Sequence, residues 1–367
     1  MSVYEECLKY KEFDFESFFE RITEDDIFRI INSRKLDEYD FLALLSPTAE
    51  RYLEEIAQKA YELTLKNFGK AVLLYTPMYL GNYCANKCVY CGFNHDNDIV
   101  RKKLTMEEIE EEAKKIYDTG LRHIIILTGS SRKETPVSYI VDSVKLLKKY
   151  FDSIAIEVYS LTEEEYIQVV EAGVDSMSIY QEVYDEEIYD KVHLAGPKKN
   201  YKFRLDAPER ACRAKMRNVC VGALLGLNDW RREFFQVGLH AKYLQDKYSD
   251  VDVAVALPRI RGHAGTFTDV HEVSDKNITQ MILASRLFLP RAGITMTTRE
   301  KAEFKNNLIP LGVNKISAGV TTEVGGHTSD EQSDPQFEII DPRSVEEVKQ
   351  DLLKIGYQPV LKDWMKI

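Results

Sequence analysis

Apolar and charged positions alternate at helical spacing through the first part of the chain. Apolar residues recur three and four positions apart in DFESFFERI (14–22) and in TAERYLEEIAQKAYELTLKNF (48–68). This spacing places them on one face of a helix. We therefore predict that residues 1–70 form a helical extension ahead of the main fold.

From residue 71 the pattern changes to short β-rich runs separated by longer amphipathic stretches. The stretch TMEEIEEEAKKIYDTG begins at Thr105, has a Glu three residues later and ends at Gly120, as a capped helix does. Such alternation is typical of strand and helix units around a parallel sheet. The eight runs are AVLLYTPMYL (71–80), HIIILTG (123–129), SIAIEVY (153–159), SMSIYQE (176–182), NVCVGALLG (218–226), DVAVALP (252–258), GITMTTR (293–299) and KISAGVT (315–321).

Eight parallel strands are the number that closes a (β/α)8 barrel of the TIM type. An open doubly wound α/β sheet would give the same local pattern, but no GxGxxG motif follows the first run. We therefore predict an α/β barrel over residues 71–321 and a short C-terminal segment, 322–367, that closes it. Ligands are then expected at the carboxyl ends of the strands.

Charge and hydropathy exclude several classes of partner. The 367 residues are 44% hydrophobic and carry a formal net charge of −11. This excess of negative charge argues against general binding to nucleic acid or to anionic membranes. The N-terminus has no basic start followed by an apolar run, and no stretch approaches about 20 apolar residues. We expect a cytoplasmic protein.

Three of the six cysteines lie within eight residues, in the run YCANKCVYCGF. Cys84, Cys88 and Cys91 have the spacing Cys-x3-Cys-x2-Cys, which lets one loop bind three corners of a cubane iron-sulfur cluster. No obvious fourth cysteine ligand appears, so one iron would stay open for a substrate or cofactor. Structural zinc is the alternative. It generally takes four protein ligands, and His95 could supply the fourth.

This cysteine run resembles the signature of the radical S-adenosylmethionine (SAM) superfamily. The resemblance implies that Cys84, Cys88 and Cys91 bind a 4Fe-4S cluster whose open iron binds S-adenosyl-L-methionine. It further implies that Tyr90 and Phe93 pack near the cluster and the adenine. Ordinary core packing is the alternative for these two aromatic residues.

Longer stretches are similar to one family within that superfamily, the 2-iminoacetate synthases. The resemblance implies Cα–Cβ cleavage of L-tyrosine to 2-iminoacetate and p-cresol for thiamine thiazole biosynthesis. It also implies reduced flavodoxin or ferredoxin as electron donor and thiazole synthase as a candidate partner. The stretches are YTPMYL (75–80), YQEVYDEEIYDKVHLAGPKKNYKFRLDAPERA (180–211), GALLGLNDWRREFF (222–235), LPRIRGHAG (257–265) and IGYQPVLKDW (355–364).

Several charged residues follow strands and are therefore expected at the mouth of the barrel. Glu182 ends the fourth predicted strand, and Arg204 follows the Gly-Pro-Lys-Lys loop. In relatives such a pair contacts S-adenosyl-L-methionine, and Glu157 at the end of the third strand is placed by the same logic. An ordinary surface ion pair is the alternative for Glu182 and Arg204.

Four further residues are candidates for binding the substrate carboxylate, because guanidinium groups bind carboxylates in bidentate fashion. Arg259, Arg261 and His263 follow the sixth predicted strand, and Arg299 ends the seventh. A solvated basic loop would give the same sequence after the sixth strand.

Two positions depart from the family pattern. Ser130 stands where relatives often have a Glu near the methionine amino group, and Thr321 lies where some relatives have an Arg. Substrate identity is therefore less constrained than the radical chemistry. The rivals are a tryptophan lyase, a hydrogenase maturase that also cleaves tyrosine but carries a further C-terminal cysteine motif, and a noncatalytic iron-sulfur assembly subunit. No cysteine follows Cys220 here.

Overall fold

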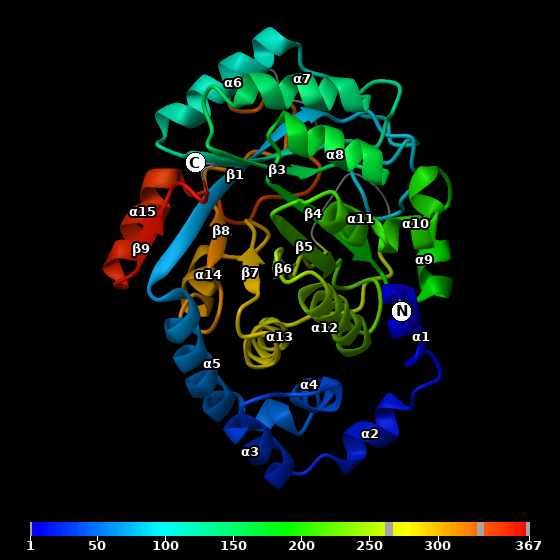
Figure 1. The fold of residues 1–367 in the computed structure, drawn as a ribbon, viewed down its shortest axis with the longest axis vertical. Coiled ribbons are helices and arrows are strands. Elements are labelled where there is room, and N and C mark those ends of the chain that lie inside the picture. The colour runs from blue at the N-terminus through cyan, green and yellow to red at the C-terminus, as the bar shows by residue number, and fades with distance from the viewer. Residues whose placement is uncertain (1, 261–266, 329–333, 365–367) are drawn as a thin grey trace.

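Eight parallel strands close into a barrel in the computed structural model, which describes residues 2–260, 267–328 and 334–364 (Figure 1). The hydrogen-bonded order is β2-β3-β4-β5-β6-β7-β8-β1, and β1 also pairs with β2, which closes the ring. Each of the eight predicted strands is present, so the predicted barrel is confirmed. The strands are β1 (Ala71–Gly81), β2 (His123–Thr128), β3 (Ser153–Glu157), β4 (Ser176–Glu182), β5 (Asn218–Ala223), β6 (Asp252–Ala256), β7 (Gly293–Met296) and β8 (Lys315–Ser317).

A ninth strand was not predicted. β9 (Gln358–Val360) runs parallel to the first residues of β1, from Ala71 to Leu73. The last residues of the same strand, from Thr76 onward, pair with β2. The backbone N–H of Arg122 donates to the carbonyl of Leu361 at 2.8 Å, which fixes the C-terminal tail beneath β2.

The helices between the strands form the outer layer of the barrel (Figure 1). Several begin with a reciprocal capping box, including the helices that follow Thr105, Thr162, Ser274 and Ser344. The outer helices are α6 (Met106–Asp118), α7 (Val137–Leu147), α8 (Glu163–Ala172), α9 (Glu186–Val192), α10 (Tyr201–Leu205), α11 (Ala207–Arg213), α12 (Trp230–Lys247), α13 (Asp275–Phe288), α14 (Ala302–Leu308) and α15 (Val345–Lys354).

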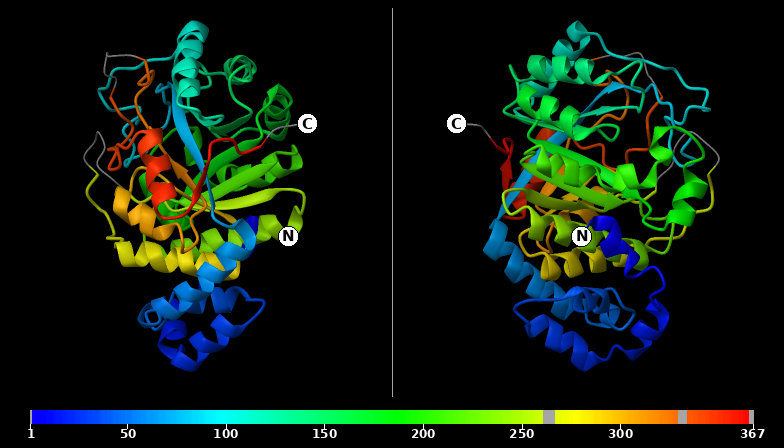
Figure 2. Two further views of the ribbon diagram at one scale, coloured as in Figure 1. Left: turned by 90° about the vertical axis from the view of Figure 1, so that its left-hand side faces the viewer. Right: turned by 45° about the vertical axis from the view of Figure 1, so that its right-hand side comes forward.

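The N-terminal residues form helices, as their apolar spacing predicts. In Figures 1 and 2 most of this segment (blue) lies outside the barrel, beyond α12 and α13. Phe41 of α4 is fully buried and stacks on Phe288 of α13, with ring centroids 4.5 Å apart. The helices are α1 (Val3–Leu8), α2 (Phe15–Arg21), α3 (Glu24–Asn32), α4 (Glu38–Leu44) and α5 (Leu53–Phe68). Among the described residues, no helix combines the length and apolar character needed to cross a membrane.

Small side chains leave the interior of the barrel partly hollow. Barrels of this type are usually filled by bulky branched residues. Here the inward positions at mid-height hold small residues, and a cavity of about 280 Å³ extends through them. The small residues that line it are Ala155, Ser178, Cys220, Ala254, Thr295 and Ser317.

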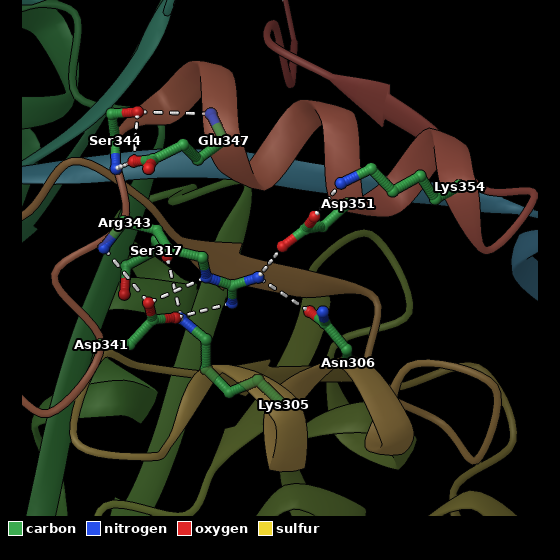
Figure 3. A network of polar contacts seen from close by, with 9 residues as sticks. All are labelled: Lys305, Asn306, Ser317, Asp341, Arg343, Ser344, Glu347, Asp351 and Lys354. Atoms are coloured by element: carbon green, nitrogen blue, oxygen red, sulfur yellow. Dashed lines mark hydrogen bonds and ion pairs between the residues drawn. The ribbon is translucent and has the colours of Figure 1, made fainter.

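Outside the barrel wall, a network of buried charges ties α14 and α15 to the segment after β8 (Figure 3). Lys305 is completely buried, and its Nζ lies 2.7 Å from a carboxylate oxygen of Asp341. Arg343 bonds the same carboxylate at 2.7 Å and reaches Asp351 at 2.8 Å. Lys305 also donates to the carbonyl of Ser317 at 3.3 Å. We call Lys305, Asp341, Arg343 and Asp351 the C-terminal network.

Candidate active site

The three clustered cysteines lie in a loop that begins where β1 ends. Arg101 holds this loop, because its guanidinium donates to the carbonyl oxygens of Asn82, Phe93, Asn94 and Asn97 at 2.6 to 3.2 Å. The side chain of Asn97 donates to the carbonyl of Cys91 at 3.2 Å. A loop without regular secondary structure thus has its backbone oxygens satisfied by side chains.

Backbone segments from β2 and from the loop after α9 pack directly on the cysteine loop. The N–H of Ala85 donates to the carbonyl of Ser130 at 2.9 Å, and the N–H of Lys87 donates to the carbonyl of Ala195 at 2.9 Å. A Cβ at Gly129 would lie 2.3 Å from the carbonyl oxygen of Tyr83, and one at Gly196 would lie 2.5 Å from that of Ala85. Only glycine permits these approaches.

The donor set fits a cluster better than a single metal ion. Cys88 is buried, whereas Cys84 and Cys91 are partly exposed. Among the residues that the structure describes, no three Cys, His, Asp or Glu side chains converge on one point where a single ion could sit. Zinc, with bonds of about 2.3 Å to sulfur, needs that convergence. A cubane instead binds each thiolate through a different iron.

Burial favours the protonated thiols of Cys88 and Cys91 in the absence of metal. It raises the pKa of the Cys88 thiol to about 12, with the neighbouring thiols adding to the effect and Lys198 opposing it. Burial also raises the pKa of Cys91. Ligation by iron therefore has to displace protons from a desolvated site.

Beside the cysteines the mouth of the barrel holds five charged side chains, which we call the mouth cluster. A small cavity of about 80 Å³ touches Cys91 and Tyr90 on one side and most of this cluster on the other. It shares Glu157, Tyr180 and Arg299 with the larger barrel cavity, so the two spaces adjoin. The members of the mouth cluster are Glu157, Glu182, Lys198, Arg204 and Arg299.

Glu182 is held in place by its backbone and by two cations. Its φ is 72°, in the left-handed region that a β-carbon disfavours. The register between β4 and β5 shifts at the same point, which turns the end of β4. Its carboxylate pairs with Lys198 at 2.6 Å and with Arg204 at 3.3 Å. The Nε of Arg204 donates to the carbonyl of Tyr180 at 2.8 Å, which fixes the guanidinium.

Glu157 lies at the end of β3 and lines both cavities. Burial raises the pKa of its carboxyl group to about 7, and the charge of Glu182 adds to the shift while Arg299 opposes it. A carboxyl group with this pKa is present in both protonation states near neutral pH. Glu157 can therefore hold or release a proton there.

Arg299 lines both cavities, as expected for a residue that follows β7. Its guanidinium stacks on the ring of Phe337 at 3.5 Å. Gln336 precedes Phe337 in the chain. Its side-chain oxygen accepts a hydrogen bond from the hydroxyl of Tyr79 at 2.8 Å, and its Nε2 lies 4.0 Å from the sulfur of Cys91.

Sequence analysis missed Gln336 and Phe337. Both lie in the segment after β8, which reads as coil and carries no motif. Figure 2 shows this segment (orange) on the same side of the barrel as the loop after β1 (cyan). The contact of Gln336 with Cys91 brings together residues 245 positions apart in sequence.

Arg259, which was predicted as a substrate ligand, lines neither of the two cavities. Its guanidinium is bonded to the carboxylate of Glu300, to Asp275 at 2.5 Å and to the carbonyl of Val273 at 2.7 Å. Its donors are therefore already used within the protein. The other two candidates after β6, Arg261 and His263, lie outside the described residues.

The remaining predicted residues divide between cavity and core. Tyr90 lines the smaller cavity, and its hydroxyl bonds Nε2 of His193 at 2.6 Å. Phe93 is 2% exposed and packs edge-on against Tyr79. Ser130 contributes its carbonyl to the cysteine loop. The hydroxyl of Thr321 accepts the N–H of Glu323 at 3.3 Å, a local turn contact.

Comparisons with known proteins identify the family. A family model described as the radical SAM superfamily matches residues 78–236, and one described as the biotin and thiamin synthesis associated domain matches residues 256–358. The chain is 37% identical over 343 residues to the 2-iminoacetate synthases of Salmonella typhimurium and Escherichia coli, over 93% of this chain and 91% of each relative. This chain belongs to the 2-iminoacetate synthase family.

Solved structures give the same assignment of fold. The crystal structure of HydG, a maturase of the FeFe-hydrogenase, aligns with a TM-score of 0.90 at 30% identity, over 97% of this chain and 80% of that chain. The crystal structure of methylornithine synthase aligns with a TM-score of 0.73 at 23% identity. In this member of the 2-iminoacetate synthase family, the radical SAM match includes the cysteine loop, Glu157 and Glu182, and the second match includes Arg299 and Gln336.

Proposed function

We propose that the chain cleaves the Cα–Cβ bond of L-tyrosine to 2-iminoacetate and p-cresol, for thiazole formation in thiamine biosynthesis. The observation that carries the proposal is 37% identity to 2-iminoacetate synthases over 93% of the chain. The cavity of about 280 Å³ supports it, because this cavity adjoins the smaller one beside Cys91 and offers a concave site for a small substrate.

In this proposal, Cys84, Cys88 and Cys91 hold a 4Fe-4S cluster, and the mouth cluster holds S-adenosyl-L-methionine against it. When bound, the cluster and S-adenosyl-L-methionine together supply the radical that abstracts hydrogen from the substrate. Glu182 would accept hydrogen bonds from ligand hydroxyl or amino groups, and its pairs with Lys198 and Arg204 hold the carboxylate in place. The smaller cavity lies between the cysteine loop and the mouth cluster, because Tyr90, Cys91 and Glu182 all line it.

Arg299 would bind the substrate carboxylate through paired N–H donors. Its stacking on Phe337 fixes the plane of the guanidinium toward the cavity it lines. Glu157 faces the same space and can exchange a proton near neutral pH, because the pKa of its carboxyl group is raised to about 7. Reduced flavodoxin or ferredoxin would supply the electron, and thiazole synthase would receive the product.

The test is anaerobic reconstitution with iron and sulfide, followed by incubation with dithionite, S-adenosyl-L-methionine and tyrosine. We expect 5′-deoxyadenosine, p-cresol and glyoxylate, the last from hydrolysis of 2-iminoacetate. Appearance of 5′-deoxyadenosine without p-cresol would refute the substrate. Absence of 5′-deoxyadenosine from a fully loaded cluster would refute the radical chemistry. The Cys88→Ala variant is the control and should lose both the cluster and turnover.

A further inference from the structure

A hydrogen-bond acceptor without a partner lies at the base of the barrel cavity. His123 is the first residue of β2 and lines the cavity, although it is only 1% exposed. Its Nε2 has no hydrogen-bond partner among the described residues. An unsatisfied buried polar atom costs free energy, so one that is retained beside a cavity points to a ligand or an ordered water.

The hydrogen bonds behind His123 determine which ring nitrogen carries the proton. Nδ1 lies 2.7 Å from the hydroxyl of Ser153, and that hydroxyl donates to the carboxylate of Asp175 at 2.9 Å. A hydroxyl has one proton to donate. Because Ser153 gives it to Asp175, it must accept from Nδ1–H of His123. Nε2 is then an unprotonated acceptor on the opposite edge of the ring.

The imidazole is also uncharged. Burial lowers the pKa of His123 well below its ordinary value, and the nearby charges of Lys315 and Arg217 lower it further. The ring therefore offers a neutral lone pair. Such a group binds an O–H or N–H donor and has no charge with which to attract a carboxylate.

Other residues around the same space suit an aromatic ring that ends in a hydroxyl. Ile125 and Leu127, on the same strand as His123, line the cavity above it. The hydroxyl of Ser317 lines it as well and is buried without a hydrogen bond of normal geometry among the described residues. The ammonium of Lys315 lies 5.3 Å from the centre of the Tyr75 ring, also at the cavity wall. Apolar side chains such as Ile125 and Leu127 thus share the cavity with polar groups nearer its base.

We propose that Nε2 of His123 accepts a hydrogen bond from the phenol hydroxyl of the substrate. Through this bond His123 selects tyrosine over phenylalanine. The inference rests on the proposed function. A tyrosine whose carboxylate is bound at Arg299 and whose ring lies in the cavity would direct its hydroxyl toward the end of the cavity that His123 lines. A site built to bond a hydroxyl rejects the analogue that lacks it, because the buried acceptor is then left unpaired.

Two variants of His123 distinguish the role of Nδ1 from that of Nε2. In His123→Asn, the side-chain amide can replace Nδ1 toward Ser153 but has no acceptor at the position of Nε2. In His123→Gln, the longer side chain can return an acceptor to that position. The matched control is His240→Asn. His240 is also buried, with an unpartnered Nε2 among the described residues, and its Nδ1 bonds the hydroxyl of Tyr184 in the wall outside the cavity.

The first experiment measures binding to the reconstituted enzyme, with p-cresol and toluene as probes. We expect the wild type and His240→Asn to bind p-cresol at least about tenfold more tightly than toluene. His123→Asn should lose this preference, and His123→Gln should regain part of it. Equal affinity of the wild type for the two probes would overturn the proposal and leave Nε2 to an ordered water. This result does not depend on turnover.

The second experiment measures kcat and KM for tyrosine. His123→Asn should raise KM about tenfold or more with a smaller change in kcat. An unchanged KM in a folded variant, while the wild type makes p-cresol, would sink the role of His123 and leave the lyase assignment standing. If the wild type makes no p-cresol but still prefers p-cresol to toluene, the lyase assignment falls and the phenol site remains. Should His123→Asn not fold, the preference of the wild type for p-cresol over toluene remains the test, because it needs no variant.

Discussion

The mouth cluster and the C-terminal network are both groups of buried and partly buried charges, but they differ in how completely the charges are paired. In the C-terminal network, Asp341 bonds both Lys305 and Arg343 at 2.7 Å. Hydrogen bonds from Arg343 and the charge of Lys305 lower the pKa of Asp341 to about 2 in spite of its burial. In the mouth cluster, Glu157 has no ion-pair partner within the described part of the chain, and burial raises its pKa to about 7.

This difference separates charges that support the fold from charges that are available to a ligand. Completely paired buried charges fix the positions of the elements that carry them. A buried carboxyl group with a shifted pKa beside a cavity is instead typical of a functional site. Arg259, bonded to Glu300 and Asp275, belongs with the first kind, although it follows a barrel strand just as Arg299 does.

The largest expected effect is on stability, from breaking the C-terminal network. Lys305→Met leaves the buried Asp341 short of a partner, and loss of one member of a buried pair typically costs about 3–5 kcal/mol of unfolding free energy. Urea unfolding of the metal-free protein measures it. The control is Lys349→Met, which breaks an exposed pair with Glu346 and should cost less than about 1 kcal/mol. Equal losses of unfolding free energy in the two variants would show that the buried pair of Lys305 stabilises the fold no more than the exposed pair of Lys349.

The next effect distinguishes the two arginines. Arg299→Lys keeps the charge but loses the paired donors, so kcat/KM for tyrosine should fall about 100-fold, which corresponds to about 2.7 kcal/mol. Arg259→Lys should lower thermal stability and leave KM within about twofold of wild type. A rise in KM for Arg259→Lys with no change for Arg299→Lys would reverse the assignment of these two residues.

A smaller effect is expected at Glu182. Glu182→Ala removes the carboxylate that pairs with Lys198 and Arg204. The affinity for S-adenosyl-L-methionine should fall about tenfold, or about 1.4 kcal/mol, while the cluster content stays the same. Equilibrium binding to the reconstituted protein and iron analysis measure the two quantities. As a control, Glu163→Ala removes an exposed partner of Arg213 and should change neither the affinity for S-adenosyl-L-methionine nor the iron content. Unchanged affinity in Glu182→Ala would make Glu182 a structural residue.

The sequence predicted the barrel well because its signal is local. Strands and helices of a barrel alternate along the chain, and each has its own hydrophobic period. β9 was missed because it has three residues, one of them Pro359, which is too short a run for a period to appear. The cysteine loop was also predictable, because its three cysteines lie within eight residues of sequence.

The parts of the site that depend on distant contacts could not be predicted. Arg259 and Arg299 look alike in sequence, and what separates them is Glu300 and Asp275, which reach Arg259 from later elements. Gln336 reaches Cys91 from a segment without any pattern. The role of His123 has no sequence signal at all, because its Nδ1 is fixed by Ser153 on β3 and by Asp175 just before β4, and its Nε2 lacks a partner among the described residues.

The last expected effect is on the pH dependence of stability, where Glu157 and Asp341 act in opposite directions. The folded-state pKa of Glu157 is raised from 4.5 to about 7, so the folded state binds the extra proton between these values. Its contribution to stability is complete below about pH 4.5 and is lost as the pH rises through 7. Asp341 is the reverse case, because its pKa is lowered from 3.8 to about 2. Its contribution is present above about pH 4 and is lost as the pH falls toward 2.

Unfolding free energies of the metal-free protein, measured at intervals from pH 3 to pH 8, test this contrast. Between pH 4.5 and 7, Glu157→Gln should remove about 1–2 kcal/mol of the decline in unfolding free energy. This is less than the full pKa shift of Glu157 would give, because its side chain is partly exposed and solvent screens its charge. Some decline should remain, because burial also raises the pKa of Glu233 to about 7. Asp341→Asn should change the slope only below about pH 4. If Glu157→Gln leaves the slope between pH 4.5 and 7 unchanged, Glu157 is as well compensated as Asp341, and pairing no longer distinguishes the mouth cluster from the C-terminal network.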